Sequence, residues 1–256
     1  MKPFLTTWKY AAALLLVTML IAAPPGSALY LVARGLYLSS VLTPLLLVAP
    51  LAAVSSTVHG HIFLPALQSA LGRSAALVKW GQWAATRPDL VPASICDTLS
   101  SLHAHAPEHG ARFTRSEVEA AIGMPIESFF DAFKETPMAS GSIGQVHWAR
   151  LNGTAVAVKV RHPRVSAELE ADFQLLSAMA AVVDCLPGLH WLDAQSTIRQ
   201  FGWSLQRHAS LEDEAHWLRA VGHNFRSWSD VLVPRPIFAS PSVLVETLLP
   251  GAPIGD

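Results

Sequence analysis

Apolar residues dominate the first quarter of the chain and form two separate runs. The first run extends from Ala11 to Ala23, after Lys2 and Lys9, and ends at the sequence PPG. It is shorter than the roughly 20 residues that a bilayer-spanning helix needs, and it is typical of the apolar part of a targeting sequence. We therefore predict a presequence-like segment over residues 1–34.

The second apolar run is longer and carries no charge from Gly35 to Val58. At about 1.5 Å per residue, a helix of this length is long enough to cross a hydrocarbon core of about 30 Å. Pro44 and Pro50 lie inside the run, and proline removes a helical hydrogen bond. The pattern predicts a transmembrane or membrane-associated segment at 35–60, either a kinked span or a re-entrant hairpin.

Short amphipathic helices are predicted over residues 65–130. Ile95, Leu99 and Leu102 recur at helical spacing and form one apolar face. Lys79 and Gln82 stand one helical turn apart in the sequence K-W-G-Q. On their own these two residues indicate only the solvated face of a helix.

The pattern changes again over 131–256, where strand-like runs alternate with helical ones. Leu169, Phe173 and Leu176 predict a helix packed on its neighbours, with Glu168, Glu170 and Asp172 on a solvated face. Four tryptophans in this part are predicted to be packing anchors rather than stacking groups for a quinone ring: Trp191, Trp203, Trp217 and Trp228.

Charge is distributed unevenly along the 256 residues, although the net charge is only -1. Residues 1–88 contain no Asp or Glu, so all 19 acidic residues lie in 89–256. An acid-free apolar front favours targeting or membrane insertion, and the absence of a basic stripe in the remainder argues against nucleic-acid binding.

No metal site is expected from the sequence. The two cysteines, Cys96 and Cys185, form no C-x-x-C motif or disulfide framework. His103, His105 and His109 lie close together, but they fall in a polar turn with no cysteine or carboxylate pattern to complete a ligand set.

The most informative chemistry lies between Pro137 and Lys159, in PMASGSIGQVHWARLNGTAVAVK. A loop of small residues lets backbone N–H groups approach phosphate oxygens, and a lysine on the following strand can reach the α and β phosphates. This pattern predicts ATP binding by Lys159 and by the loop residues Ala139, Ser140, Gly141, Ser142, Gly144 and Gln145.

Three ordered motifs make the chain resemble the UbiB (AarF) family of atypical kinases: K-W-G-Q with A-T-R-P-D-L-V-P, P-x-A-S-G-S-I-G-Q-V-H, and V-A-V-K-V-R-H-P. The resemblance covers about residues 70–255. It implies an α+β fold with a protein-kinase-like small lobe over 131–256, a twisted antiparallel sheet plus helices, preceded by a helical extension. It also implies an ATPase or small-molecule kinase that supports coenzyme Q biosynthesis, anchored in a mitochondrial membrane, with the bacterial inner membrane as the weaker alternative.

The resemblance also assigns roles to individual residues. Lys79 and Gln82 match the extension motif that enters the nucleotide cleft, and Lys159 matches the phosphate-binding lysine. Glu214 matches the helix glutamate that holds this lysine in place. Glu246 matches the start of the link whose backbone binds adenine, with Val245 near the gatekeeper position.

The chain departs from the family pattern at several places. His208 and Ser210 stand where the family has the two acids of an E-x-D motif that engages the extension lysine. The catalytic loop and the aspartate that holds Mg²⁺ lie downstream in the family, so we expect a fragment or truncated form that is inactive alone. The alternative is a membrane-tethered pseudokinase or scaffold. The phosphoryl acceptor and any partner beyond nucleotide, lipid or quinone-pathway components stay open.

Overall fold

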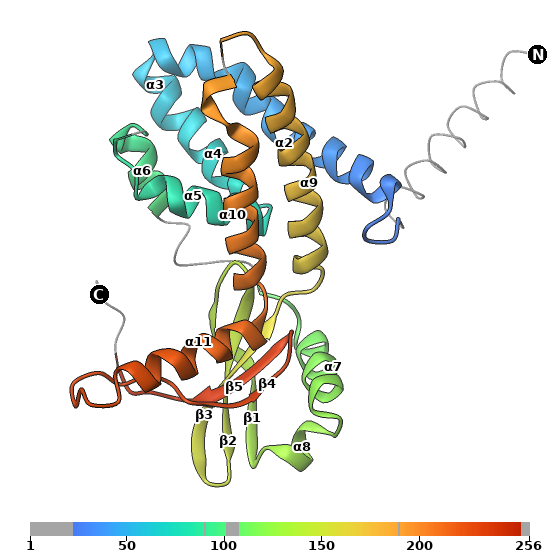
Figure 1. Ribbon diagram of the computed structural model, residues 1–256, viewed down its shortest axis with the longest axis vertical. Coiled ribbons are helices and arrows are strands. Elements are labelled where there is room, and N and C mark those ends of the chain that lie inside the picture. Colours follow the sequence, from blue (N-terminus) through green and yellow to red (C-terminus); the bar gives the residue numbers. More distant parts are fainter. Residues whose placement is uncertain (1–22, 90, 101–107, 189, 252–256) are drawn as a thin grey trace, which may run out of the picture. The chain divides into compact units, whose positions relative to one another are not determined.

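The computed structural model describes residues 23–89, 91–100, 108–188 and 190–251, and the chain divides into two compact units (Figure 1). The first unit consists of residues 1–98 and 166–202, and the second of residues 99–165 and 203–256. Each unit is built from two stretches of chain that are distant in sequence. This division differs from the predicted consecutive segments at 65–130 and 131–256.

The second unit is built on a five-stranded sheet of order β1-β2-β3-β5-β4, in which every neighbouring pair is antiparallel. The strands are β1 (Ala132–Ser140), β2 (Gly144–Leu151), β3 (Thr154–Arg161), β4 (Pro236–Ala239) and β5 (Val243–Thr247). Asn152 and Gly153 join β2 to β3 with positive φ angles of 49° and 76°, as a tight Asn-Gly hairpin turn requires. The sheet and its helices confirm the predicted α+β fold class.

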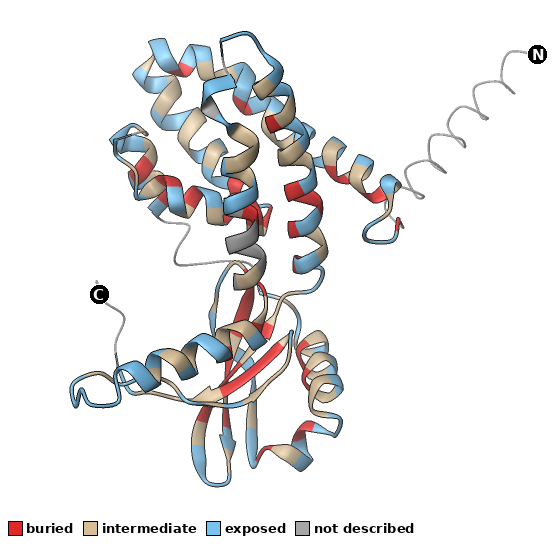
Figure 2. Ribbon diagram, viewed as in Figure 1, coloured by how far each residue is buried: buried red, intermediate tan, exposed pale blue. Residues whose placement is uncertain are grey.

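Helices cover both faces of this sheet. α7 (Ala111–Ile122) and α8 (Ile126–Phe129) place Val118 and Ile126 in one core with the inward valines of β3 and β5: Val156, Val158, Val160, Val243 and Val245. On the other face Leu211 and Ala215 of α11 (Leu211–Asn224) pack on Leu244 of β5. In Figure 2 the central strands are accordingly the most continuously buried part of this unit.

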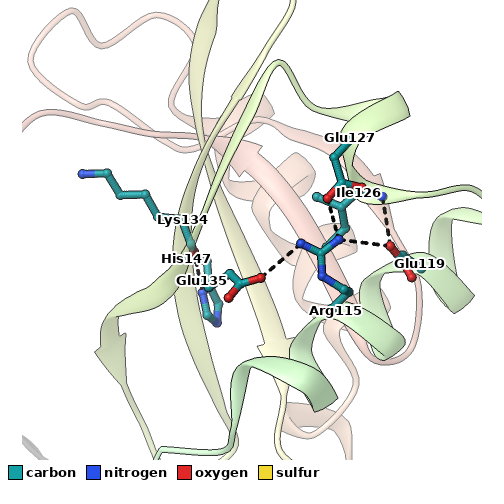
Figure 3. Close-up of polar contacts among 7 residues, drawn as sticks. All are labelled: Arg115, Glu119, Ile126, Glu127, Lys134, Glu135 and His147. Carbon is teal, nitrogen blue, oxygen red and sulfur yellow. Dashed lines mark hydrogen bonds and ion pairs between the residues drawn. The ribbon is translucent and has the colours of Figure 1, made fainter.

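An arginine on the surface of α7, Arg115, forms ion pairs with α8 and with the edge strand β1 (Figure 3). The Arg115 guanidinium lies 2.6 Å from Glu127 of α8 and 3.1 Å from Glu135 of β1. Glu119 accepts a hydrogen bond from the backbone N–H of Ile126, at the start of α8. These exposed contacts fix the direction in which α8 enters β1.

The first unit is helical. Its elements are α2 (Ala28–Val54), α3 (Ser56–Val58), the π-helical turn η1 (His59–Phe63), α4 (Leu64–Leu71), α5 (Ala75–Ala85), α6 (Ala93–Ser100), α9 (Val165–Cys185), η3 (His190–Leu192) and α10 (Ala194–His208). Of these, α6 and α10 end in the second unit, and α9 begins there with its first residue. Among the described residues α2 is the one helix long and apolar enough to cross a membrane. It begins at Ala28, capped by Ser27, so it includes the last residues of the predicted presequence segment.

Two predictions about individual side chains are wrong. Leu169 and Phe173 of α9 are buried as expected, but Asp172 is only 2% exposed instead of solvated. The reason is that its carboxylate binds Arg34 and Ser74, two polar groups that are themselves buried. Trp191, Trp217 and Trp228 are exposed, so they are not packing anchors within the described residues. Leu102, His103 and His105 lie outside those residues.

Candidate functional site

The site centres on Lys159 of β3 and Glu214 of α11. The lysine Nζ donates to both carboxylate oxygens of Glu214, at 2.7 and 2.6 Å. Both side chains are half-buried, so solvent screens the pair and its main effect is to hold the lysine in one direction. The structure thus brings together two residues that lie 55 positions apart in the chain.

A third charged group, Glu246 of β5, shares this face of the sheet. Lys159 pairs with Leu244 and Ala157 pairs with Glu246 across β3 and β5, and because side chains alternate, all four lie on one face. Burial raises the pKa of the Glu246 carboxyl, the nearby Glu214 raises it further, and Lys159 opposes both. Its Oε2 is buried without a hydrogen-bond partner among the described residues.

The register also separates two neighbouring residues of β5. Val245 pairs with Val158 and lies in the valine core on the opposite face. Leu244, fully buried, is the residue that shares a face with Lys159. Glu246 itself lies inside β5, paired with Ala157 on one side and Pro236 on the other. Its predicted backbone contact with adenine stays a prediction.

The predicted phosphate loop is the tight connection between β1 and β2. Ala139 and Ser140 end β1, and the Gly141 N–H donates to the Gly144 carbonyl at 2.9 Å, which closes the turn around Ser142. A Cβ at Gly144 would lie 2.5 Å from the Val160 carbonyl oxygen. Sheet packing alone therefore requires this glycine, whereas a Cβ at Gly141 meets only an ordinary contact at 3.6 Å.

The Gln145 side chain points into the unit instead of toward the loop surface. It is fully buried, accepts from the His109 N–H at 3.0 Å, and donates to Thr114 and His147 at 3.2 and 3.0 Å. These bonds occupy the side-chain amide, so any nucleotide contact at this position falls to the backbone.

Two histidines, His162 and His109, support the β1–β2 loop through a chain of hydrogen bonds. Since a carbonyl oxygen can only accept, His162 donates from Nε2 to the Gly141 carbonyl at 2.9 Å. Its Nδ1 lies 2.7 Å from Nδ1 of His109, so a neutral His162 accepts there and His109 donates. Sequence reasoning missed both residues in this role, because they are 53 positions apart.

The start of α11 is held by two further residues, Arg161 and Ser210, whose roles here sequence reasoning missed. Arg161, two residues after Lys159 on the same strand face, donates to the Ala209 carbonyl at 3.2 Å. Ser210 caps the helix by accepting from the Asp213 N–H at 3.3 Å. The S-x-x-D pattern from Ser210 to Asp213 was an available helix-start signal. Both contacts help to keep Glu214 opposite Lys159.

Lys79 and Gln82 lie on α5, in the first unit, and both are half-buried. α5 begins at Ser74, whose hydroxyl accepts from the Leu77 N–H. The entry of these residues into a nucleotide site stays a prediction. At the altered E-x-D positions, Ser210 serves as the cap described above, and the His208 side chain is outside the described part.

The arrangement suits binding of a phosphate group. A lysine held by a carboxylate stands beside a turn of small residues with backbone N–H groups at its edge, as a triphosphate requires. The described residues contain no group of three or more His, Cys, Asp or Glu side chains arranged to hold a metal.

Comparison with known proteins agrees with this geometry. The ABC1 atypical kinase-like domain matches residues 101–256. The chain is 39% identical over 183 residues to a probable serine/threonine-protein kinase, abkC, of Dictyostelium discoideum, covering 70% of this chain and 27% of the relative. It is 29% identical to a mitochondrial ABC1 family protein of Schizosaccharomyces pombe, covering 86% of this chain and 38% of that protein. A probable protein kinase UbiB of a Shewanella strain is 35% identical, with coverage of 70% and 34%.

A solved structure is similar as well. The structure of the Rv3197–erythromycin complex from Mycobacterium tuberculosis matches with a TM-score of 0.51 and 27% identity, over 58% of this chain and 38% of that one. The chain thus spans between about a quarter and two fifths of the length of these relatives.

Proposed function

Because this chain belongs to the ABC1 atypical kinase-like family, which its match over residues 101–256 establishes, we propose that it provides the nucleotide-binding part of a phosphotransferase or ATPase that takes Mg·ATP. The observation that carries the proposal is the Lys159–Glu214 pair beside the loop from Ala139 to Gln145. In this arrangement Lys159 neutralises phosphate charge, and Glu214 keeps it positioned.

We further propose a role in coenzyme Q or related lipid metabolism at a mitochondrial membrane. The similarity to proteins named UbiB and to fungal ABC1 proteins named as mitochondrial supports this assignment. The long apolar helix α2 supports membrane association, and the inner membrane is the proposed site.

The test is Mg·ATP binding to the full chain, measured by calorimetry and by thermal stabilisation, with Lys159→Met as the variant. Loss of a charge-assisted contact of about 1.5–3 kcal/mol weakens binding on the order of tenfold to a hundredfold. Lys134→Met is the matched control, since this exposed lysine of β1 contacts the ring of Trp148 and not the site. Unchanged affinity in Lys159→Met would refute the assignment.

A second candidate is a membrane-tethered scaffold without catalysis. The observation that favours it is Ser210. This residue stands at an E-x-D position where the family has an acidic residue, and its side chain caps α11. Binding of nucleotide by the wild-type chain with no phosphate release or transfer in the full-length protein would support the scaffold over the enzyme.

A further inference from the structure

The two ends of a long apolar segment meet at one carboxylate in the first unit. Asp172 of α9 accepts from Arg34 of α2, with Nε to Oδ1 at 2.6 Å and Nη2 to Oδ2 at 2.9 Å. The Ser74 hydroxyl, at the start of α5, donates to Oδ2 of the same carboxylate at 2.5 Å. All three residues are buried. The chain therefore leaves this point along α2 and returns to it after α4.

Between these ends no charged side chain occurs. Residues 35–72 contain no Asp, Glu, Lys or Arg, and the first basic residue after them, Arg73, adjoins Ser74. The segment folds as α2, α3, η1 and α4, which we call the α2–α4 hairpin. Its far end bends back toward α6, where His59 is hydrogen-bonded to Ser94 at 3.0 Å.

One side of the hairpin exposes large apolar side chains. Leu46, Leu47, Leu51 and Val54 are 72%, 72%, 60% and 84% exposed, and at 3.6 residues per turn they fall within about 140° of the helix circumference. Leu45 and Ala52, on the opposite side of the same helix, are buried. The helix thus packs with one apolar face and presents another.

We propose that this exposed face lies in one leaflet of a lipid bilayer, and that the hairpin enters and leaves the leaflet on the same side. The proposal rests on the membrane association in the proposed function and is independent of nucleotide binding. The sequence left two forms open, a kinked span and a re-entrant hairpin, and the proposal favours the re-entrant hairpin.

The occupant of the face is hydrocarbon, because the face lacks the features of a protein interface. Protein interfaces carry a polar rim and arginines around their apolar centre, whereas every residue of this segment from 35 to 72 is uncharged. The charged residues that flank this segment along the chain, Arg34 and Arg73, stand at the base of the hairpin. Such a boundary between uncharged and charged residues is what a membrane surface selects.

A complete crossing is incompatible with the shared carboxylate. A single span would place Arg34 and Ser74 on opposite sides of the bilayer, and the hydrogen bonds that both make to Asp172 could not coexist. Separating them would break either the buried Arg34–Asp172 ion pair or the buried Ser74–Asp172 hydrogen bond, and either loss leaves a buried polar group without its partner, which is costly.

The first experiment counts labels on each molecule. The full chain with Cys185→Ser carries Pro25→Cys before the hairpin and Arg73→Cys just after its end, at an exposed position outside the uncharged segment; Cys96 is buried and stays unlabelled. After reconstitution into sealed phosphatidylcholine vesicles, an impermeant maleimide is added and intact mass is measured. The hairpin predicts molecules with two labels or none. Molecules that carry one label throughout would show a span and overturn the proposal.

The second experiment tests the face itself. Leu47→Asp should reduce flotation with neutral phosphatidylcholine vesicles at least tenfold, whereas Leu232→Asp, at a comparably exposed leucine of the second unit, should not. Equal flotation of both variants, or no flotation of the wild type, would refute lipid contact. Mg·ATP binding measured on the same samples separates this failure from failure of the nucleotide assignment, since Leu47 is outside the Lys159 unit.

Discussion

The two units place charge and apolar surface in opposite ways. In the sheet unit the valines of β3 and β5 are fully buried, and the paired charges of Lys159 and Glu214 lie at a half-exposed surface. In the helical unit the best-buried charges, Arg34 and Asp172, are inside, and leucines of α2 face outward. The difference teaches that the two units solve burial in different ways, and it supports the two proposals made above, a charged ligand in water for the sheet unit and lipid contact for the α2–α4 hairpin.

The largest expected effect comes from breaking the buried charge of the helical unit. Asp172→Asn leaves the Arg34 guanidinium buried without its carboxylate, and such a loss costs about 3–5 kcal/mol of unfolding free energy. Chemical denaturation of the full chain measures it. The control Glu168→Gln removes a longer contact of 3.5 Å to the same arginine and should cost less than about 1 kcal/mol.

Replacing the pair together sharpens the result. Arg34→Met combined with Asp172→Leu removes both charges, and buried ion pairs replaced by apolar residues are often neutral in stability. Recovery of most of the lost stability would show that the carboxylate compensates the arginine. A double variant as unstable as Asp172→Asn would contradict that explanation.

The next effect tests how closely the sheet unit is packed. Gly144→Ala places a Cβ against the Val160 carbonyl, and the backbone shift should cost about 1–3 kcal/mol. In Gly141→Ala the added Cβ meets only an ordinary van der Waals contact with the Gly144 carbonyl oxygen. Stability should therefore change by less than about 0.5 kcal/mol. Thermal unfolding of both variants measures the contrast. Equal losses would mean that the glycines serve the turn itself rather than the β2–β3 contact.

The last effect is a pH dependence of stability in the sheet unit. The pKa of His109 is lowered to about 4, first by burial and then by His162 and His147. Because unfolded histidine titrates near about 6.5, the unfolded chain binds more protons between these values, and stability falls as pH decreases through that window. The lowered pKa values of His147 and His162 act in the same direction.

A matched pair of variants isolates this effect. His109→Asn keeps a donor toward His162 but does not titrate, so the fall in melting temperature between about pH 6.5 and pH 4 should become flatter. The exposed His216→Asn should leave the slope as in the wild type. A slope that is unchanged by His109→Asn would place the acid sensitivity elsewhere.

Much of the sheet unit could be predicted from the sequence, because its signals are local. Alternating apolar residues around Lys159 indicate a strand, and small residues from Ala139 to Gly144 indicate a tight loop. The family motifs then indicated both the family and the role of Glu214. The match over residues 101–256 confirms the family. The inward direction of Gln145 was missed, since its hydrogen-bond partners come from a helix distant in sequence.

The helical unit was predicted less well, because its decisive contacts are not local. Asp172 follows Glu168 and Glu170 in a pattern that looks like a solvated face, and its partner Arg34 is 138 positions away. The charge-free run predicted contact with a membrane but not its form. Choosing between span and hairpin required the position of Ser74 relative to Arg34, which no periodicity encodes.

Because both ends of the α2–α4 hairpin bind Asp172, the hairpin can change its length without losing its base. The entropic cost of closing a loop grows slowly, by about 0.6 kcal/mol for each doubling of its residues. Matched insertions or deletions of whole helical turns in the outgoing arm (α2) and in the return arm (α3 to α4) are therefore expected to leave Arg34 and Ser74 in place. The depth to which the proposed hairpin enters its leaflet can therefore change while α5, with Lys79 and Gln82, keeps the same starting point.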